Sequence, residues 1–189
     1  MLKVGFALCG SFCTISRALD EAALLAVEYD LVPIVSGNVK NTDTRFGTAA
    51  SVLERLSSVT GREIIDTVMD AEPLGPKEPL DALLIAPCTG NTLAKLANGI
   101  TDTAVTMAAK AHLRQGRPLV IALASNDAMS ANLKNVATLL NRKSVYFVPM
   151  LQDDPEKKPS SLVADFGLIP EALKAALSGK QIYPLFRTV

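Results

Sequence analysis

Four short segments rich in glycine, hydroxyl and amide side chains could carry chemistry, because each directly follows a strand-like apolar run. They are Cys9-Gly10-Ser11-Phe12-Cys13-Thr14, Ser36-Gly37-Asn38, Pro87-Cys88-Thr89-Gly90-Asn91-Thr92 and Ser125-Asn126-Asp127. A phosphate group is bound by free backbone N–H groups at a helix start and by hydroxyl donors. Gly10, Ser11, Thr14 and Ser36 supply these features, so we expect them to bind the phosphate of a cofactor.

The third segment has the groups that a flat heterocycle needs along its edge. Thr89, Gly90, Asn91 and Thr92 offer hydroxyl, amide and backbone partners. The same residue types also form ordinary turns and helix N-caps, and that interpretation stays open for each segment. The sequence has no classical nucleotide fingerprint: Gly5 lies within the first apolar run, so no GxGxxG follows it, and no GK[ST] occurs.

Apolar runs of strand length alternate with helically spaced apolar residues along the chain. The runs predict strands at 3–9, 31–35, 81–86, 118–124 and 145–149, with a further short strand at 63–67. The helical spacing predicts helices at 14–29, 46–58, 91–98, 104–114 and 128–141. Continuous apolar strands separated by helices are typical of a parallel sheet covered on both faces. We therefore predict a three-layer α/β fold, in which ligands bind beyond the carboxyl ends of the strands.

The length of 189 residues fits one domain spanning 1–189. Two stretches interrupt the alternating pattern. Residues 70–79 hold three prolines and a glycine, and residues 152–161 hold five charged side chains and two prolines. Both predict surface excursions. We expect the second, extended to about 152–166, to be a mobile, lid-like segment.

The charge balance excludes some classes of partner. Nineteen Lys and Arg residues balance nineteen Asp and Glu residues, which argues against a bulk electrostatic nucleic-acid binder. No apolar run approaches the roughly 18 residues of a membrane span, and the apolar stretch 4–9 is too short for a signal peptide. Only 20% of residues are charged and the mean hydropathy is +0.26, which predicts an apolar interface and hence a homo-oligomer.

Cysteine and histidine usage limits the redox and metal chemistry. Cys9, Cys13 and Cys88 form no CxxC pair and no disulfide framework, so we expect a reduced, cytoplasmic setting. His112 is the only histidine, and a His-based metal site or a Ser-His-Asp triad would depend on it alone. Its surroundings, with Lys110 and Arg114 nearby, predict an ordinary residue of a surface helix. We expect no metal site.

Residues 87–102 resemble the PxSANTxxKxAxGxxD signature of flavoproteins related to phosphopantothenoylcysteine decarboxylase, lantibiotic-processing cysteine decarboxylases and flavin prenyltransferases. Gly10-Ser11 resembles the family's loop at the flavin phosphate. Residues 123–129 fall where the decarboxylases have PxMNxxM, with Asn126 and Met129 kept. The resemblance implies a Rossmann-like, flavodoxin-like fold, FMN at a subunit interface, and trimer-based assemblies.

Two departures from the decarboxylases are informative. Their catalytic His precedes the strand that leads to the signature loop, and no His occurs at 70–80 here. Their flap Cys corresponds to Ala164 or a neighbouring residue. Both decarboxylase groups are missing, so we predict that this chain is not a cysteine decarboxylase. Cys88 is expected to be a small buried residue rather than a nucleophile.

Residues 42–47 and 153–166 resemble one branch of this family, the flavoprotein-type B subunits of dipicolinate synthases from spore-forming bacteria. This branch implies an oxidoreductase subunit that takes part in oxidising a (hydroxy)tetrahydrodipicolinate to dipicolinate during sporulation. FMN is the implied cofactor. The dehydrogenase-like A subunit of dipicolinate synthase is the implied partner, and NAD(P) would enter only through that partner.

A dicarboxylate substrate requires cationic donors in a chain without net charge. Arg45 is the best candidate, because a planar guanidinium binds a carboxylate with two hydrogen bonds. Lys158 is the second cationic candidate, and Asn126 could bind substrate or flavin. Their structural alternatives are a surface or oligomer contact for Arg45, a solvated charge for Lys158 and a helix N-cap for Asn126. No residue is assigned as catalytic.

Two other functions stay open. One is a scaffold or substrate-binding subunit that has lost its flavin. The other is a flavin prenyltransferase-like enzyme, a class that shares a turn of the type Pro87-Cys88-Thr89.

Overall fold

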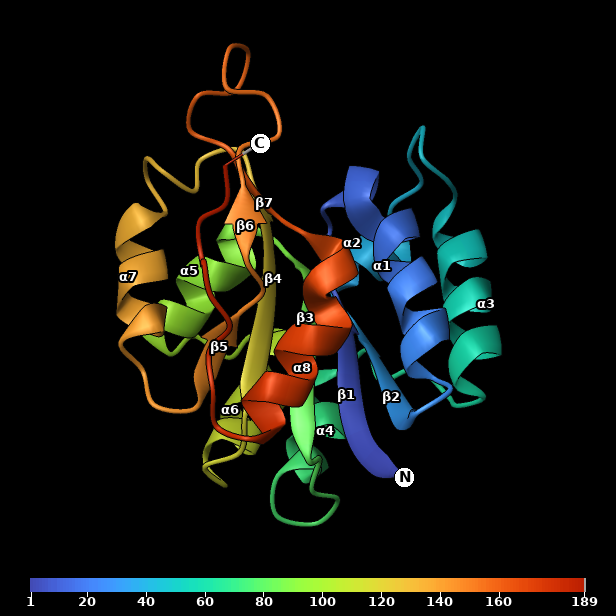
Figure 1. The fold of residues 1–189 in the computed structure, drawn as a ribbon. Coiled ribbons are helices and arrows are strands. Elements are labelled where there is room, and N and C mark those ends of the chain that lie inside the picture. Colours follow the sequence, from blue (N-terminus) through green and yellow to red (C-terminus); the bar gives the residue numbers. More distant parts are fainter. Residues whose placement is uncertain (189) are drawn as a thin grey trace.

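A parallel sheet forms the centre of the computed structural model, which describes residues 1–188 (Figure 1). Its parallel strands lie in the order β2-β1-β3-β4-β5, which is the flavodoxin-like doubly wound order. Their bounds are Leu2–Leu8 for β1, Tyr29–Val35 for β2, Ala82–Cys88 for β3, Leu119–Ser125 for β4 and Val145–Phe147 for β5. The predicted Rossmann-like α/β class is confirmed.

Two short strands make the sheet mixed rather than wholly parallel. β6 (Met150–Leu151) and β7 (Leu162–Ala164) form an antiparallel pair, and β7 also runs antiparallel to the end of β4, with Ala124 opposite Val163. β5 pairs with the first half of β4, which leaves the second half free for β7. The prediction of a parallel sheet is therefore corrected at this edge. β6 and β7 have two and three residues and flank the charged stretch 152–161, so they carry too little alternation to be recognised in the sequence.

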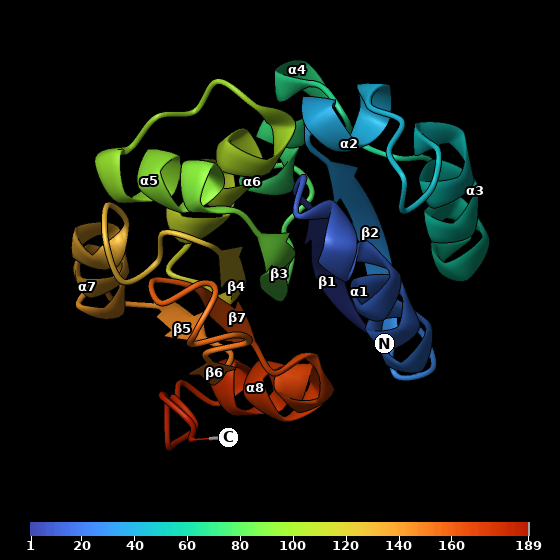
Figure 2. The same ribbon diagram turned by 90° about the horizontal axis from the view of Figure 1, so that it is seen from above.

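Helices cover both faces of the sheet, as predicted, and Figure 2 shows the three layers. One face packs against α1 (Phe12–Leu25), α3 (Ala49–Thr60) and α8 (Ile169–Leu177), through buried residues such as Leu19, Leu56 and Leu173. The other face packs against α5 (Gly90–Asn98), α6 (Ala104–Leu113) and α7 (Leu133–Leu140). The remaining short helices are α2 (Gly37–Asn41), α4 (Val68–Ala71), η1 (Glu72–Leu74) and η2 (Phe166–Leu168).

Two helices begin later than the apolar spacing indicates. The helix predicted at 46–58 starts at Ala49, because Thr44 and Gly47 close a hydrogen-bonded turn and Thr48 caps the helix. The helix predicted at 128–141 starts at Leu133, because the Asp127 carbonyl accepts hydrogen bonds from the backbone N–H groups of residues 130 and 132. The strand predicted at 63–67 is reduced to a single bridge between Ile34 and Ile65.

His112 lies on α6, in agreement with the predicted helix, and its side chain is buried rather than facing solvent. Its Nε2 lies 2.9 Å from the Pro118 carbonyl oxygen and donates to it, and its buried Nδ1 has no partner among the described residues. Burial lowers the pKa of His112, and the neighbouring Arg117 lowers it further. The folded protein therefore binds a proton at this imidazole more weakly than the unfolded chain does.

We expect this buried imidazole to make the fold sensitive to acid. The unfolded chain binds a proton at His112 near pH 6.5, whereas the folded chain resists it, so stability is full above that pH and falls below it. The contribution reaches at most about 1.4 kcal/mol per pH unit. Urea unfolding between pH 7 and pH 5 measures how the free energy of unfolding changes with pH. In His112→Gln the part of this pH dependence that comes from the imidazole should vanish. An unchanged slope in the variant would assign the acid sensitivity to other groups.

Among the described residues, no helix is both long enough and apolar enough to cross a bilayer.

Candidate functional site

A depression of about 820 Å³ opens at the carboxyl ends of β1, β3 and β4. It collects most of the residues that the sequence analysis assigned to a site. The predicted residues in its lining are Gly10, Ser11, Thr14, Arg45, Thr89, Gly90, Asn126 and Lys158. Its other walls include Phe12, Arg17, Phe46, Ser125 and Asp127. The side chains come from five loops that the sequence separates widely, and the sheet order brings them together.

Three predicted residues lie outside this lining. Asn91 is exposed near the start of α5. The Thr92 side chain is buried and donates to the Cys9 sulfur at 3.3 Å. Ser36 lies at the start of α2, and its buried hydroxyl has no hydrogen-bond partner among the described residues.

The loop after β1 forms the start of α1. The Thr14 hydroxyl donates to the Ser11 carbonyl oxygen at 2.9 Å, which fixes the first turn. A Cβ atom on Gly10 would lie 3.2 Å from the Asn38 Cβ, so the loops after β1 and β2 are in close contact. The first N–H groups of a helix lack partners one turn earlier within the helix. In α1 the Thr14 N–H donates to the Ser11 carbonyl oxygen, and Phe12 and Cys13 at the same helix start also line the depression.

The loop after β3 serves mainly to start α5. The Thr89 hydroxyl accepts a hydrogen bond from the Thr92 backbone N–H at 3.2 Å, so the N-cap interpretation holds for Thr89. Burial raises the pKa of the Cys9 thiol to about 11 and raises that of Cys88 as well. Both thiols are protonated and unreactive at neutral pH. The prediction that Cys88 is a small buried residue is confirmed.

The loop after β4 contains a hydrogen-bonded group that the sequence analysis missed. The Ser125 hydroxyl donates to one carboxylate oxygen of Asp127 at 2.5 Å, and the Asn132 amide donates to the other at 2.9 Å. These two hydrogen bonds lower the pKa of Asp127 below its usual range. Asp127 is therefore ionised at neutral pH. The sequence signal was its position directly after Asn126, in a loop already assigned to the site.

Three cations border the depression. Arg45 lies over the Phe46 ring at 4.8 Å, and Arg17 lies over the Phe166 ring at 5.1 Å. Lys158 forms an ion pair with Asp153 at 3.0 Å, which raises the pKa of the lysine.

Arg17 was also missed by the sequence analysis. Its signal is helical spacing: it follows Thr14 by three residues, which places the two on one side of α1. Lys40, the other cation near the loop after β2, pairs with Asp66 at 2.7 Å and does not line the depression.

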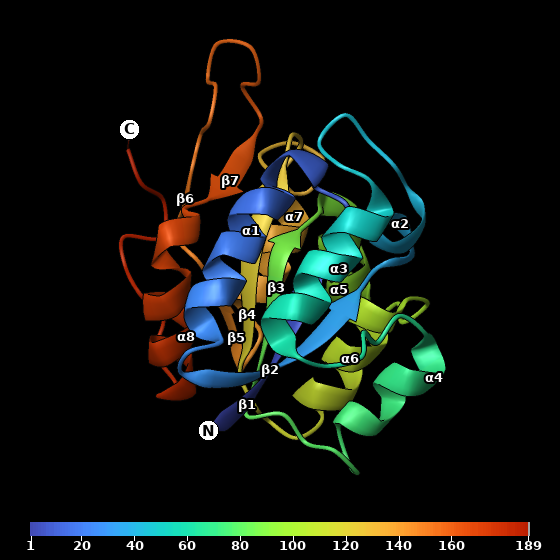
Figure 3. The same ribbon diagram turned by 90° about the vertical axis from the view of Figure 1, so that its right-hand side faces the viewer.

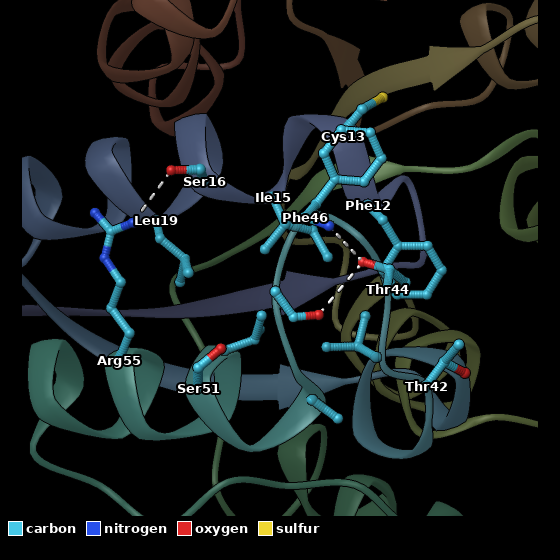
Figure 4. A pocket seen from close by; sticks show the side chains of 14 residues that line it. Phe12, Cys13, Ile15, Ser16, Leu19, Thr42, Thr44, Phe46, Ser51 and Arg55 are labelled. Carbon is cyan, nitrogen blue, oxygen red and sulfur yellow. Dashed lines mark hydrogen bonds between the residues drawn. The ribbon is translucent and has the colours of Figure 1, made fainter.

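A smaller hollow of about 250 Å³ adjoins the depression, and Figure 4 shows its side chains. It lies between α1, α3 and the 42–47 turn, and it shares Phe12, Cys13 and Phe46 with the larger space. Arg55 closes its far end by donating to Asp20 at 2.6 Å.

We next consider whether the described residues form a metal-binding site. Within residues 1–188, no three His, Cys, Asp or Glu side chains converge as metal ligands would.

Residues 4–171 match the model of the family described as Flavoprotein. The chain belongs to the Flavoprotein family. A relative from Bacillus subtilis (strain 168), the B subunit of dipicolinate synthase, is 45% identical over 184 residues, which are 97% of this chain and 92% of the relative. The crystal structure of the dipicolinate synthase B subunit from Bacillus halodurans C is 41% identical, with a TM-score of 0.91 over 99% of this chain and 96% of that one. The predicted resemblance to that branch of the flavoproteins is confirmed.

More distant flavoproteins share the fold. The FMN-dependent cysteine decarboxylase SpaF has a TM-score of 0.71 at 24% identity, over 94% of this chain and 96% of that one. The flavin prenyltransferase UbiX of Thermoplasma acidophilum (strain ATCC 25905 / DSM 1728 / JCM 9062 / NBRC 15155 / AMRC-C165) is 35% identical over 69 residues, which are 36% of this chain and 38% of the relative.

This flavoprotein departs from the signature at Gly90, where the PxSANT pattern has Ala. The structure gives the reason, because a Cβ atom on Gly90 would lie 2.4 Å from the Ser125 Oγ and 2.8 Å from an Asp127 carboxylate oxygen. The glycine therefore makes room for the polar group after β4. The glycine at position 90 and the polar group after β4 therefore depend on one another, although 35 residues separate Gly90 from Ser125.

Proposed function

We propose that this chain is the flavoprotein-type subunit of a dipicolinate synthase, and that it takes part in oxidising a (hydroxy)tetrahydrodipicolinate to dipicolinate during sporulation. The observation that carries the proposal is the depression with two arginines and an FMN-type phosphate loop, in a chain 45% identical to the B subunit of a dipicolinate synthase. The proposal includes the dehydrogenase-like A subunit as partner, with NAD(P) bound only there. It also includes a trimer-based homo-oligomer in the cytoplasm; exposed Ile100 and Leu133 and the free cysteines support these two parts.

The depression fits FMN by size and by donors. Ligand sites of this kind have volumes of roughly 300–1,000 Å³. We assign the phosphate to Gly10, Ser11 and Thr14 at the start of α1, with the unpartnered Ser36 hydroxyl as a further donor. Thr89 and Gly90 contribute backbone groups to the ring edge, the Thr92 N–H holds the start of α5 by donating to the Thr89 hydroxyl, and the exposed Asn91 is kept as a proposed flavin contact. When bound, FMN would supply the hydride acceptor for the ring that becomes aromatic.

The remaining residues position the substrate. Arg17 and Arg45 would bind its carboxylates, and Lys158 and Asn126 would complete the wall around it. Phe12 and Phe46 give that space an apolar wall. Cysteine decarboxylation is not part of the proposal, because Ala164 occupies the flap Cys region and is buried within β7.

We also propose that residues 152–161 act as a mobile lid, a shorter segment than the predicted 152–166, because residues 162–164 form β7 and Phe166 is buried. Lys158 and Asp153 line the depression, whereas residues 155–157 are exposed and project beyond the strand ends in Figures 1 and 3. Slower proteolytic cleavage between residues 154 and 159 when dicarboxylate is added would support closure. An unchanged cleavage rate would contradict it.

The first test is a visible absorption spectrum of the purified protein with and without added FMN, followed by gel filtration. Yellow colour that travels with the protein is the expected result. Anaerobic bleaching by reduced substrate then tests the redox role. Protein that stays colourless would favour the alternative of a substrate-binding subunit that has lost flavin.

We expect Ser36→Ala to raise the Kd for FMN about tenfold. A hydrogen bond to a charged group is worth about 1.5–3 kcal/mol. The Ser36 hydroxyl has no hydrogen-bond partner among the described residues, so the substitution should break no hydrogen bond within the protein. Fluorescence titration of FMN measures the Kd. Ser178→Ala at the end of α8 is the matched control and should leave it unchanged. Equal values for the two variants would remove Ser36 from the phosphate site.

A further inference from the structure

The hydrogen-bonded group after β4 is an extended chain rather than a single contact. Asn135 on α7 donates to the Asn132 side-chain carbonyl oxygen at 2.8 Å, and Asn132 in turn donates to Asp127. Asn132 and Asn135 are buried, whereas Asp127 lines the depression. We call Ser125, Asp127 and Asn132 the polar triad. The helix thus fixes the direction of one carboxylate at the wall of the site.

The partners of Asp127 are neutral, so its negative charge is not compensated. Its two hydrogen bonds use two of the roughly four lone-pair positions of a carboxylate, which leaves capacity for a further donor. The other acid in this wall, Asp153, is already paired with Lys158. Arg17 and Arg45 form no ion pair within residues 1–188. The depression therefore presents two free cations and one free anion.

This charge pattern is complementary to a particular ligand. Two carboxylates satisfy the arginines, and an N–H group satisfies the carboxylate of Asp127. A reduced nitrogen heterocycle with flanking carboxylates has all three groups when its nitrogen is an amine, an enamine or a protonated imine. The aromatic pyridine has lost that N–H and turns a lone pair toward the same position, where Asp127 would repel it.

We propose that Asp127 accepts a hydrogen bond from the ring N–H of a reduced heterocyclic dicarboxylate, and so selects the reduced ring over the aromatic one. The inference rests on the proposed function and names the specificity-determining residue of that site. Gly90 is needed for this arrangement, because a Cβ atom there would lie 2.4–2.8 Å from side-chain atoms of all three members of the polar triad. The selection would favour substrate entry and product release.

The test compares three ligands on the full-length, FMN-loaded protein by calorimetry. Piperidine-2,6-dicarboxylate presents N–H groups, pyridine-2,6-dicarboxylate presents a lone pair, and benzene-1,3-dicarboxylate presents neither. We expect the wild-type protein to bind the piperidine at least about tenfold more tightly than the pyridine, as for a charge-assisted hydrogen bond. In Asp127→Asn this ratio should fall to about threefold or less, mainly through weaker piperidine binding.

Two further variants separate recognition from folding. Gly90→Ala should displace the polar triad and reduce the ratio while Asp127 is still present, and Gly167→Ala, whose Cβ would meet nothing closer than 3.6 Å, is its control. Asp102→Asn removes a carboxylate that pairs with Lys95 outside the depression and should keep the wild-type ratio.

The outcomes separate this inference from the proposed function. A wild-type ratio retained in both Asp127→Asn and Gly90→Ala would overturn the inference but leave the dicarboxylate site standing. Equal binding of all three ligands by the wild-type protein would do the same. Failure of the wild-type protein to bind any of them would overturn the proposed substrate class, and this inference with it.

Discussion

Arg45→Ala should raise the KM for the dicarboxylate substrate by about ten- to a hundredfold in an assay with both subunits. A hydrogen bond to a charged group is worth about 1.5–3 kcal/mol, and a guanidinium makes two of them to one carboxylate. Arg17→Ala should have an effect of similar size. Because the two side chains come from different elements and would bind different carboxylates, their effects should multiply, and the double variant should raise KM by about a hundred- to ten-thousandfold.

FMN binding provides the internal control for these variants. We expect the flavin absorbance per protomer to remain at the wild-type level, because neither arginine belongs to the proposed phosphate loop. Arg62→Ala removes an arginine that pairs with Asp30 outside the depression, and should leave KM unchanged. Arg45→Lys should fall between the wild type and Arg45→Ala, since an ammonium keeps the charge but loses the planar fork. An unchanged KM in the double variant would assign both arginines to packing on Phe46 and Phe166.

Phe6→Ala should lower the free energy of unfolding by about 3–5 kcal/mol. Phe6 is fully buried in the middle of β1, in the apolar layer that holds α1 and α8 against the sheet. Removing the ring leaves a cavity next to the strand that carries the Gly10-Ser11 loop. We therefore expect a fall in FMN affinity as well as in stability.

Urea unfolding monitored by circular dichroism measures this loss. Phe6→Leu should cost less, because it retains most of the buried volume. Leu24→Ala, at an exposed position of α1, should change stability by no more than about 0.5 kcal/mol. Similar losses for Phe6→Ala and Leu24→Ala would contradict the assignment of Phe6 to the core.

The parallel part of the fold could be predicted because buried strands have a simple sequence pattern. Leu83, Leu84 and Ile85 in β3 face opposite sides of the sheet in alternation, yet all three are buried, so the run is continuously apolar. The loops that follow such strands must then share one edge of the sheet. That rule is sufficient to place Gly10, Thr89 and Asn126 in one site from the amino-acid sequence alone.

The parts that escaped prediction depend on contacts between distant residues. His112 resembles a surface position by its neighbours in the sequence, and only the packing of α6 buries it. Arg17 and Asp127 have side chains that are usually solvated, so nothing local distinguishes them from other surface charges. The start of α7 was misjudged because hydrogen bonds to the Asp127 carbonyl hold residues 128–132 out of the helix. Apolar spacing carries no information about those bonds.

The pairing of β7 with β4 has an evolutionary consequence. Residues 152–161 connect β6 to β7, and both ends of this connection are fixed: Leu151 pairs with Val163, and Leu162 pairs with Ser125 beside the depression. Doubling the length of a flexible connection costs only about 0.6 kcal/mol of folding free energy. Insertions and substitutions between the two anchors can therefore accumulate with little loss of stability, while the segment stays beside the same ligand. Relatives with this sheet can therefore diverge in the ligands that they bind through changes in the single segment between β6 and β7.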